Sequence, residues 1–204
     1  MPAIVVADAD VLFGGATRAL LIYLDYAGAI RLHWSPLILA EMSRALVDTE
    51  RKVNLATAQE NEVRMNQALA GANIPTVAVQ RNLQQVQHAV KSAKDAHVAA
   101  AAYTLLADEY YPHLQTVGLV SRNLPDYDIP ALQTLGVLVQ HPDPFLLALT
   151  ARQQAVVAGA FRAMRLDLAS KPTPDQLLVR LANDGQKQTT AALAALEQAT
   201  PGTL

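Results

Sequence analysis

The chain of 204 residues contains no cysteine, which excludes a disulfide-stapled scaffold and a thiol-ligated metal site. It has no cluster of five or more Lys and Arg, and 16 basic residues face 18 acidic ones, so charge alone does not indicate a nucleic-acid binder. Its uncharged stretches are interrupted by Asn, Gln, Gly and Pro, unlike a membrane span of about 20 apolar residues. No basic segment precedes an apolar one at the N-terminus, so we expect no cleaved signal and a cytoplasmic protein.

Hydrophobic residues make up 51% of the chain, which is enough for an ordinary core. Short apolar runs predict strands at 3–7, 30–34, 76–79, 117–121 and 137–140. Helical periodicity predicts helices at 17–26, 36–47, 49–70, 82–90, 92–109 and 129–135. This alternation implies βαβ units, in which helices cover both faces of a parallel sheet.

The composition changes after the segment 141–144. An Ala-rich helical stretch covers 145–168, Thr173 and Pro174 begin a further helix to Ala182, and a final helix follows the break at 184–185. We therefore expect an α/β domain over residues 1–143 and an all-α C-terminal extension over residues 144–204. Apolar residues recur every three to four positions in the extension, so we expect them to form a core or a dimer contact.

Two carboxylates, Asp8 and Asp10, come directly after the first predicted strand. Ligands of open parallel sheets bind beyond the carboxyl ends of the strands. Carboxylates held so close together repel each other, which is costly without a cation. The alternative is that one of them caps the following turn.

Two further acids, Glu41 and Asp95, lie on predicted helices. Glu41 is on the flank of an apolar stripe, and its simplest interpretation is a solvated glutamate paired with Arg44. Asp95 precedes apolar residues at helical spacing, which places it on the inward face of its helix. The alternative for Asp95 is a capping box with Ser92.

Polar residues also follow the strand at 117–121. Ser121, Asn123 and Asp126 should emerge on the same side of the sheet as Asp8, although a polar turn before Pro130 is the simpler alternative. The acids together offer hard oxygen ligands, with no histidine pair at ligand spacing, which suits Mg²⁺ or Mn²⁺ rather than Zn²⁺. We expect the scattered histidines to be structural or exposed: His33, His88, His97, His113 and His141.

These segments, in their order and spacing, resemble the PIN-domain ribonucleases found as VapC toxins of bacterial toxin–antitoxin pairs. The resemblance covers residues 3 to about 150, and the remaining helices resemble an extension carried by a subset of VapC-like proteins. The matching segments are Val5-Val6-Ala7-Asp8-Ala9-Asp10-Val11-Leu12-Phe13, Ser35-Pro36-Leu37-Ile38-Leu39-Ala40-Glu41, Lys94-Asp95-Ala96-His97-Val98-Ala99-Ala100-Ala101, Ser121-Arg122-Asn123-Leu124-Pro125-Asp126-Tyr127, and 137–145.

The resemblance implies a three-layer PIN-like domain and a metal-dependent endoribonuclease. It implies that one or two Mg²⁺ or Mn²⁺ ions are held by Asp8, Glu41, Asp95 and Asp126. Asp10 stands where the family usually has Asn or another small polar residue, and it would be a further ligand or a hydrogen-bond acceptor. It also implies an RNA substrate, a cognate antitoxin and a homodimer. The residues expected at the substrate are Ser121, Asn123, Arg44, Lys94 and Arg122, the last standing where an aromatic residue or Asn is common.

Two other classes of function remain open. The run before Asp8 and Asp10 also fits haloacid-dehalogenase-like phosphatases, in which Asp8 would be the nucleophile and Asp10 the acid/base. Those enzymes need a later lysine and an acidic pair at a strand end, whereas the last predicted strand ends in His141-Pro142-Asp143. The third class is a non-catalytic binding module of PIN fold, against which the presence of all four family acids argues.

Overall fold

The computed structural model describes residues 2–108, 110–111 and 113–204. The chain divides into two compact units, which are described separately. We call the first the sheet unit, formed by Ala3–Phe13 and Leu32–Gln140. We call the second the helical unit, formed mainly by Gly14–Arg31 and His141–Leu204.

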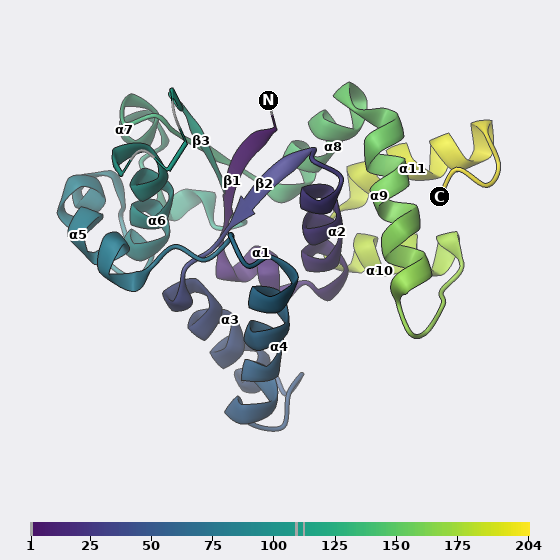
Figure 1. The fold of residues 1–204 in the computed structure, drawn as a ribbon, viewed down its shortest axis with the longest axis horizontal. Helices are drawn as coiled ribbons and strands as arrows, with labels where there is room; N and C mark the ends of the chain where they lie inside the picture. Colours follow the sequence, from purple (N-terminus) through teal and green to yellow (C-terminus); the bar gives the residue numbers. More distant parts are fainter. Residues whose placement is uncertain (1, 109, 112) are drawn as a thin grey trace. The chain divides into compact units, whose positions relative to one another are not determined.

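The sheet unit is built on a sheet of four strands in the order β2-β1-β3-β4 among the described residues (Figure 1). The pairs β1–β3 and β3–β4 are parallel, with Val6 opposite Leu119. Both of these side chains are fully buried, as expected for strands covered on both faces. The predicted α/β class with a central parallel sheet is confirmed. The strands are β1 (Ala3–Ala7), β2 (Ile30–His33), β3 (Val117–Val120) and β4 (Val137–Gln140).

Helices of the sheet unit pack on this sheet and on one another. The long helix α6 contacts β1, β3 and β4, while α3 packs on α1 and α4. Ser35 caps α3 by accepting a hydrogen bond from Ile38 N, and Asp128 caps α7 through Ala131 N. The helices are α1 (Ala9–Phe13), α3 (Pro36–Asp48), α4 (Leu55–Ala68), α5 (Thr76–Val86), α6 (Ala96–Ala107) and α7 (Ile129–Thr134), with 3₁₀ turns η1 (Gln87–Ala89) and η2 (Leu124–Asp126).

The predicted strand at 76–79 is wrong, because these residues form the first turn of α5. Their β-branched side chains suggested a strand, but the buried residues Ala78, Val79, Asn82 and Val86 follow a helical period that extends past the window. The helix predicted at 82–90 is thus the end of α5, followed by η1.

Two predicted helix starts also differ from the structure. The helix predicted at 92–109 begins at Ala96, so Ser92 is not its cap and the capping box with Asp95 is wrong. Its predicted last residue, Glu109, lies outside the described residues. The helical stretch predicted at 49–70 is helical only from Leu55, where Asn54 and Thr57 form a capping box.

The helical unit contains α2 (Gly15–Tyr26), α8 (Pro142–Arg152), α9 (Gln154–Asp167), α10 (Pro174–Asn183) and α11 (Lys187–Ala199). Within it, α2 packs on α9 and α10, and α11 packs on α8 and α10. The predicted all-α C-terminal extension is confirmed, although its first helical stretch is broken at Gln153. The helical unit also includes α2, which lies far before residue 143 in the sequence. The predicted domain boundary at residue 143 stays a prediction. In the part of the chain that the structure describes, no helix is long and apolar enough to cross a membrane.

Candidate active site

Asp8 lies at the carboxyl end of β1 and is only 4% exposed. Its Oδ1 accepts a hydrogen bond from Ala9 N at 2.6 Å, and its Oδ2 accepts from Ser121 Oγ at 2.7 Å and Tyr127 OH at 3.1 Å. Burial raises the pKa of Asp8, which the hydrogen bonds from Ser121 and Ala9 oppose and the negative charge of Glu41 increases. The hydrogen bonds therefore fix the position of the Asp8 carboxylate, but its surroundings compensate its negative charge poorly.

Asp10, in the first turn of α1, joins the end of β1 to the loop after β3. Its Oδ2 accepts a hydrogen bond from Arg122 N at 2.9 Å and lies 3.5 Å from Ser121 Oγ. Its Oδ1 is buried and has no hydrogen-bond partner in the described chain. Burial and the charge of Asp8 raise the pKa of Asp10 to about 7. One carboxylate oxygen is thus available to a cation.

Asp95 and Asp126 extend this acidic cluster from two other segments. Asp95 is buried directly before α6, and its side chain does not cap that helix among the described residues. Burial, a hydrogen bond with Asp126 and the charge of Asp8 raise the pKa of Asp95 to about 6. Asp126 lies in η2, where its Oδ2 accepts a hydrogen bond from Asn123 Nδ2.

Glu41 comes from α3, and its side chain is 39% exposed. Its Oε2 lies 3.3 Å from Nε2 of His97 on α6. A hydrogen bond with His97 lowers the pKa of Glu41, burial opposes this, and the charges of His97, Arg44 and Lys94 lower it further. The direct partner of Glu41 is therefore His97 rather than the predicted Arg44, whose Nε donates to Ala40 O.

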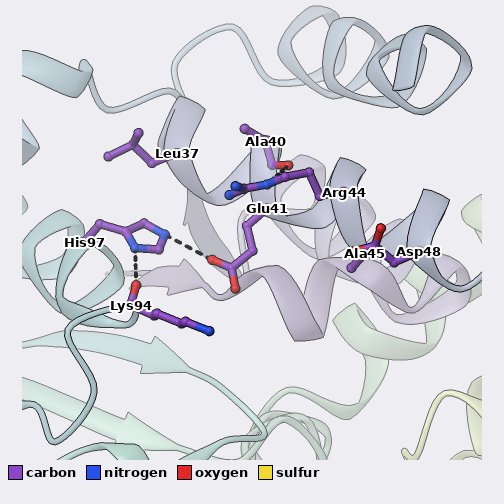
Figure 2. A pocket seen from close by; sticks show the side chains of 8 residues that line it. All are labelled: Leu37, Ala40, Glu41, Arg44, Ala45, Asp48, Lys94 and His97. Atoms are coloured by element: carbon purple, nitrogen blue, oxygen red, sulfur yellow. Dashed lines mark hydrogen bonds and ion pairs between the residues drawn. The ribbon is translucent and has the colours of Figure 1, made fainter. Parts of the chain in front are cut away.

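A hollow of about 610 Å³ opens beside Glu41. Figure 2 shows Glu41 among the side chains of Arg44, Lys94 and His97 in this hollow. Its charged lining is mixed, because the exposed Arg44 and Lys94 lie beside the acids Glu41 and Asp48. The lining also includes Leu37 and Ala40 from α3.

The structure brings together the acids that the sequence singled out. Asp8 interacts electrostatically with Asp10, Glu41 and Asp95, and Asp95 interacts with Asp126. Ser121 and Asn123 hydrogen-bond carboxylates of this group, whereas Arg122 contributes its backbone N–H to Asp10. We call Asp8, Asp10, Glu41, Asp95 and Asp126 the acidic cluster. The roles of its members as ligands or catalytic groups stay predictions.

The acidic cluster fits a hard divalent cation by its chemistry. It offers only carboxylate oxygens, several with raised pKa values because like charges are buried together, and Asp10 Oδ1 is an unsatisfied acceptor. No three acidic or histidine side chains of the described chain form a group that could hold an ion by themselves. Mg²⁺ usually keeps several waters and uses one or two carboxylates, so a preassembled set of three ligands is not required.

Sequence reasoning missed two contacts of the acidic cluster. Tyr127 lies next to Asp126 in the sequence, yet its buried hydroxyl donates to Asp8. His97 was expected to be structural or exposed rather than a ligand, and the sequence did not predict that its Nε2 lies 3.3 Å from Glu41 Oε2. The position of His97, two residues after Asp95 and near the start of the same helix, could have indicated that it lies close to the acidic cluster.

The variant Asp10→Asn should stabilise the metal-free protein by about 1–2 kcal/mol at pH 8. The folded-state pKa of Asp10 is raised from 3.8 to about 7, so the folded protein holds a proton that the unfolded chain has already lost. The stabilisation of the folded state by protonated Asp10 is present at low pH and is lost as pH rises through 7. Urea unfolding in EDTA should therefore show a gain at pH 8 that shrinks towards pH 4, and an equal gain at both pH values would contradict this explanation.

Comparison with known proteins gives a match for the C-terminal helices. Residues 142–195, from α8 into α11, match the family described as VapC50 C-terminal domain. No curated protein and no solved structure matches the chain. The match therefore concerns the C-terminal helices, which are similar to the C-terminal domain of a VapC protein.

Proposed function

We propose that this protein is a metal-dependent endoribonuclease that hydrolyses phosphodiester bonds of RNA and acts as the toxin of a toxin–antitoxin pair. The observation that carries the proposal is the acidic cluster, whose members come from segments far apart in the sequence and influence one another's pKa values. The link to the VapC family implies a nuclease. In the hollow beside Glu41, the exposed Arg44 and Lys94 offer two positive charges to the phosphates of a substrate.

The residues that would hold Mg²⁺ or Mn²⁺ are Asp8, Glu41, Asp95 and Asp126, together with Asp10, whose Oδ1 has no hydrogen-bond donor in the described chain. When bound, such an ion supplies an activated water for in-line attack on the phosphodiester and stabilises the departing 3′-oxygen, which leaves a 5′-phosphate.

The other residues orient this site and attract the substrate. The Ser121 hydroxyl donates to Asp8 Oδ2 and fixes the direction of that carboxylate, while the Asn123 amide holds Asp126. The exposed Arg44 and Lys94 attract the phosphates of the RNA into the hollow next to Glu41. Arg122 follows Ser121 and lies beside Asp10, where its charge offsets that of the carboxylate.

The proposal includes two protein partners. An antitoxin with an amphipathic segment would cover the site, and a second copy of the chain would form a homodimer. Light scattering of the purified protein, alone and mixed with the product of a neighbouring reading frame, measures both associations.

The test of the proposal is cleavage of end-labelled RNA by the purified full chain. We expect cleavage with Mn²⁺ or Mg²⁺, products with a 5′-phosphate, and no cleavage in EDTA. Full cleavage in EDTA would refute the metal mechanism. Release of phosphate from small phosphoesters, without RNA cleavage, would favour the phosphatase alternative, and no hydrolysis of either substrate would favour a non-catalytic module.

A further inference from the structure

Tyr127 directly follows η2, and its large side chain is only 2% exposed. Its hydroxyl donates a hydrogen bond to Asp8 Oδ2 at 3.1 Å, and the same oxygen accepts a hydrogen bond from Ser121 Oγ at 2.7 Å. A buried phenol needs a partner for its hydroxyl, and a carboxylate is a strong acceptor. Two side chains therefore hold one oxygen of the carboxylate at the centre of the acidic cluster.

The backbone around Tyr127 is bound to the segment that leads to Asp95. Tyr127 forms an isolated antiparallel bridge with Val90, and Lys91 N donates a hydrogen bond to Asp126 O at 2.7 Å. Because this pairing anchors the backbone and the ring is buried, the hydroxyl has little freedom to leave its acceptor. Tyr127 thus connects that acceptor to the segments that carry two further members of the acidic cluster.

The two oxygens of the Asp8 carboxylate are occupied unequally. Each oxygen of an ionised carboxylate can accept at two lone pairs. Oδ2 accepts from two donors, Ser121 and Tyr127, whereas Oδ1 accepts a single hydrogen bond among the described residues, from Ala9 N at 2.6 Å. This arrangement leaves Oδ1 as the oxygen that can take a further ligand.

We propose that Tyr127 is a positioning residue for the divalent-ion site, because its hydroxyl shares Oδ2 of Asp8 with Ser121 and leaves Oδ1 for the ion. This inference rests on the proposed function, since it assigns an orienting donor to an acid of the same site. Hydrogen-bond partners of ligating carboxylates typically contribute about 10- to 100-fold to metal affinity. A purely structural role, in which the ring only fills the core, would be kept by phenylalanine and would leave that affinity unchanged.

The first experiment measures Mn²⁺ binding to the full chain by calorimetry. Tyr127→Phe keeps the ring and removes only the hydroxyl, and we expect the Kd for Mn²⁺ to rise about 10- to 100-fold. The matched control is Tyr23→Phe, which removes a tyrosine hydroxyl that donates to Asp167 Oδ2 at 2.7 Å in the helical unit. This control should bind Mn²⁺ as the unaltered protein does, and melting curves in EDTA show whether both variants fold.

The second experiment follows the hydroxyl proton of Tyr127 by NMR in the unaltered protein. A buried hydroxyl that donates a hydrogen bond exchanges slowly with water, so its proton should give a signal that Tyr127→Phe removes. Addition of Mg²⁺ should shift this signal without abolishing it, because Asp8 keeps Oδ2 on the tyrosine while Oδ1 takes the ion.

The outcomes separate this inference from the proposed function. Unchanged Mn²⁺ affinity in a folded Tyr127→Phe variant would overturn the inference and leave the proposed nuclease intact. Absence of the hydroxyl signal in the metal-free protein, or its loss when Mg²⁺ binds, would do the same, and this measurement decides alone if Tyr127→Phe does not fold. Absence of divalent-ion binding by the unaltered chain would overturn both.

Discussion

Asp8→Asn is expected to lower the rate of RNA cleavage by about 10³-fold or more. Asp8 is the centre of the acidic cluster, because its charge influences Asp10, Asp95 and Tyr127. Asparagine retains the size of the side chain but removes the charge that attracts a divalent ion. Single-turnover cleavage of labelled RNA with saturating Mn²⁺ measures the loss.

The control for this substitution is Asp128→Asn. Asp128 is an exposed aspartate shortly after the acidic cluster, and it caps α7, a role that asparagine also fills well. Its cleavage rate should equal that of the unaltered protein. Melting curves of both variants in EDTA show whether the fold survives, and a folded Asp8→Asn variant with full activity would eliminate Asp8 from the mechanism.

The parts of the fold that follow from local patterns could be predicted from the sequence. The run Ala3–Ala7 ends at a charged residue, and it forms β1 with Asp8 directly after it. Ser35 followed by Pro36 marks the start of α3, and the cap is observed. These features depend on a few neighbouring residues, whose preferences agree with the final fold.

The start of α5 could not be predicted in the same way. The four residues 76–79 are rich in β-branched side chains, which favour a strand over so short a window. In the structure, Ala78 and Val79 are buried together with Asn82, whose Nδ2 donates to Thr104 Oγ1 on α6. This packing on α6 outweighs the local preference, and it involves a partner 22 residues away.

For the acidic cluster, the sequence predicted which acids meet but not which groups hold them. The strand ends and the resemblance brought Asp8, Asp95 and Asp126 to one region. The donors to Asp8 from Ser121 and Tyr127 are more than 100 residues away in the sequence, and their contacts depend on the exact path of the loop after β3. The same holds for His97 and Glu41, which meet only because α3 packs on α6.

The helical unit provides the second large expected effect, in Asp143→Ala. Asp143 is 5% exposed in the first turn of α8, and it accepts hydrogen bonds from Gln188 N and Thr189 N, each at 2.9 Å, and from Thr189 Oγ1 at 2.7 Å. These donors begin α11, whose N-cap residue Gln186 provides no side-chain cap in the described chain. An aspartate of one helix thus caps another and meets its positive end.

Asp143→Ala should therefore lower the free energy of unfolding by about 3 kcal/mol, because it leaves buried donors of α11 without an acceptor. Asp143→Asn keeps one acceptor oxygen and should lose less. Asp175→Ala, which removes an exposed acid in the first turn of α10, should change stability by about 0.5 kcal/mol or less. Urea unfolding gives the three values, and hydrogen exchange at the amides of Gln188 and Thr189 should accelerate in the Asp143→Ala variant. Equal stability of the Asp143→Ala and Asp175→Ala variants would show that α11 does not depend on this cap, and that its packing on α8 and α10 suffices.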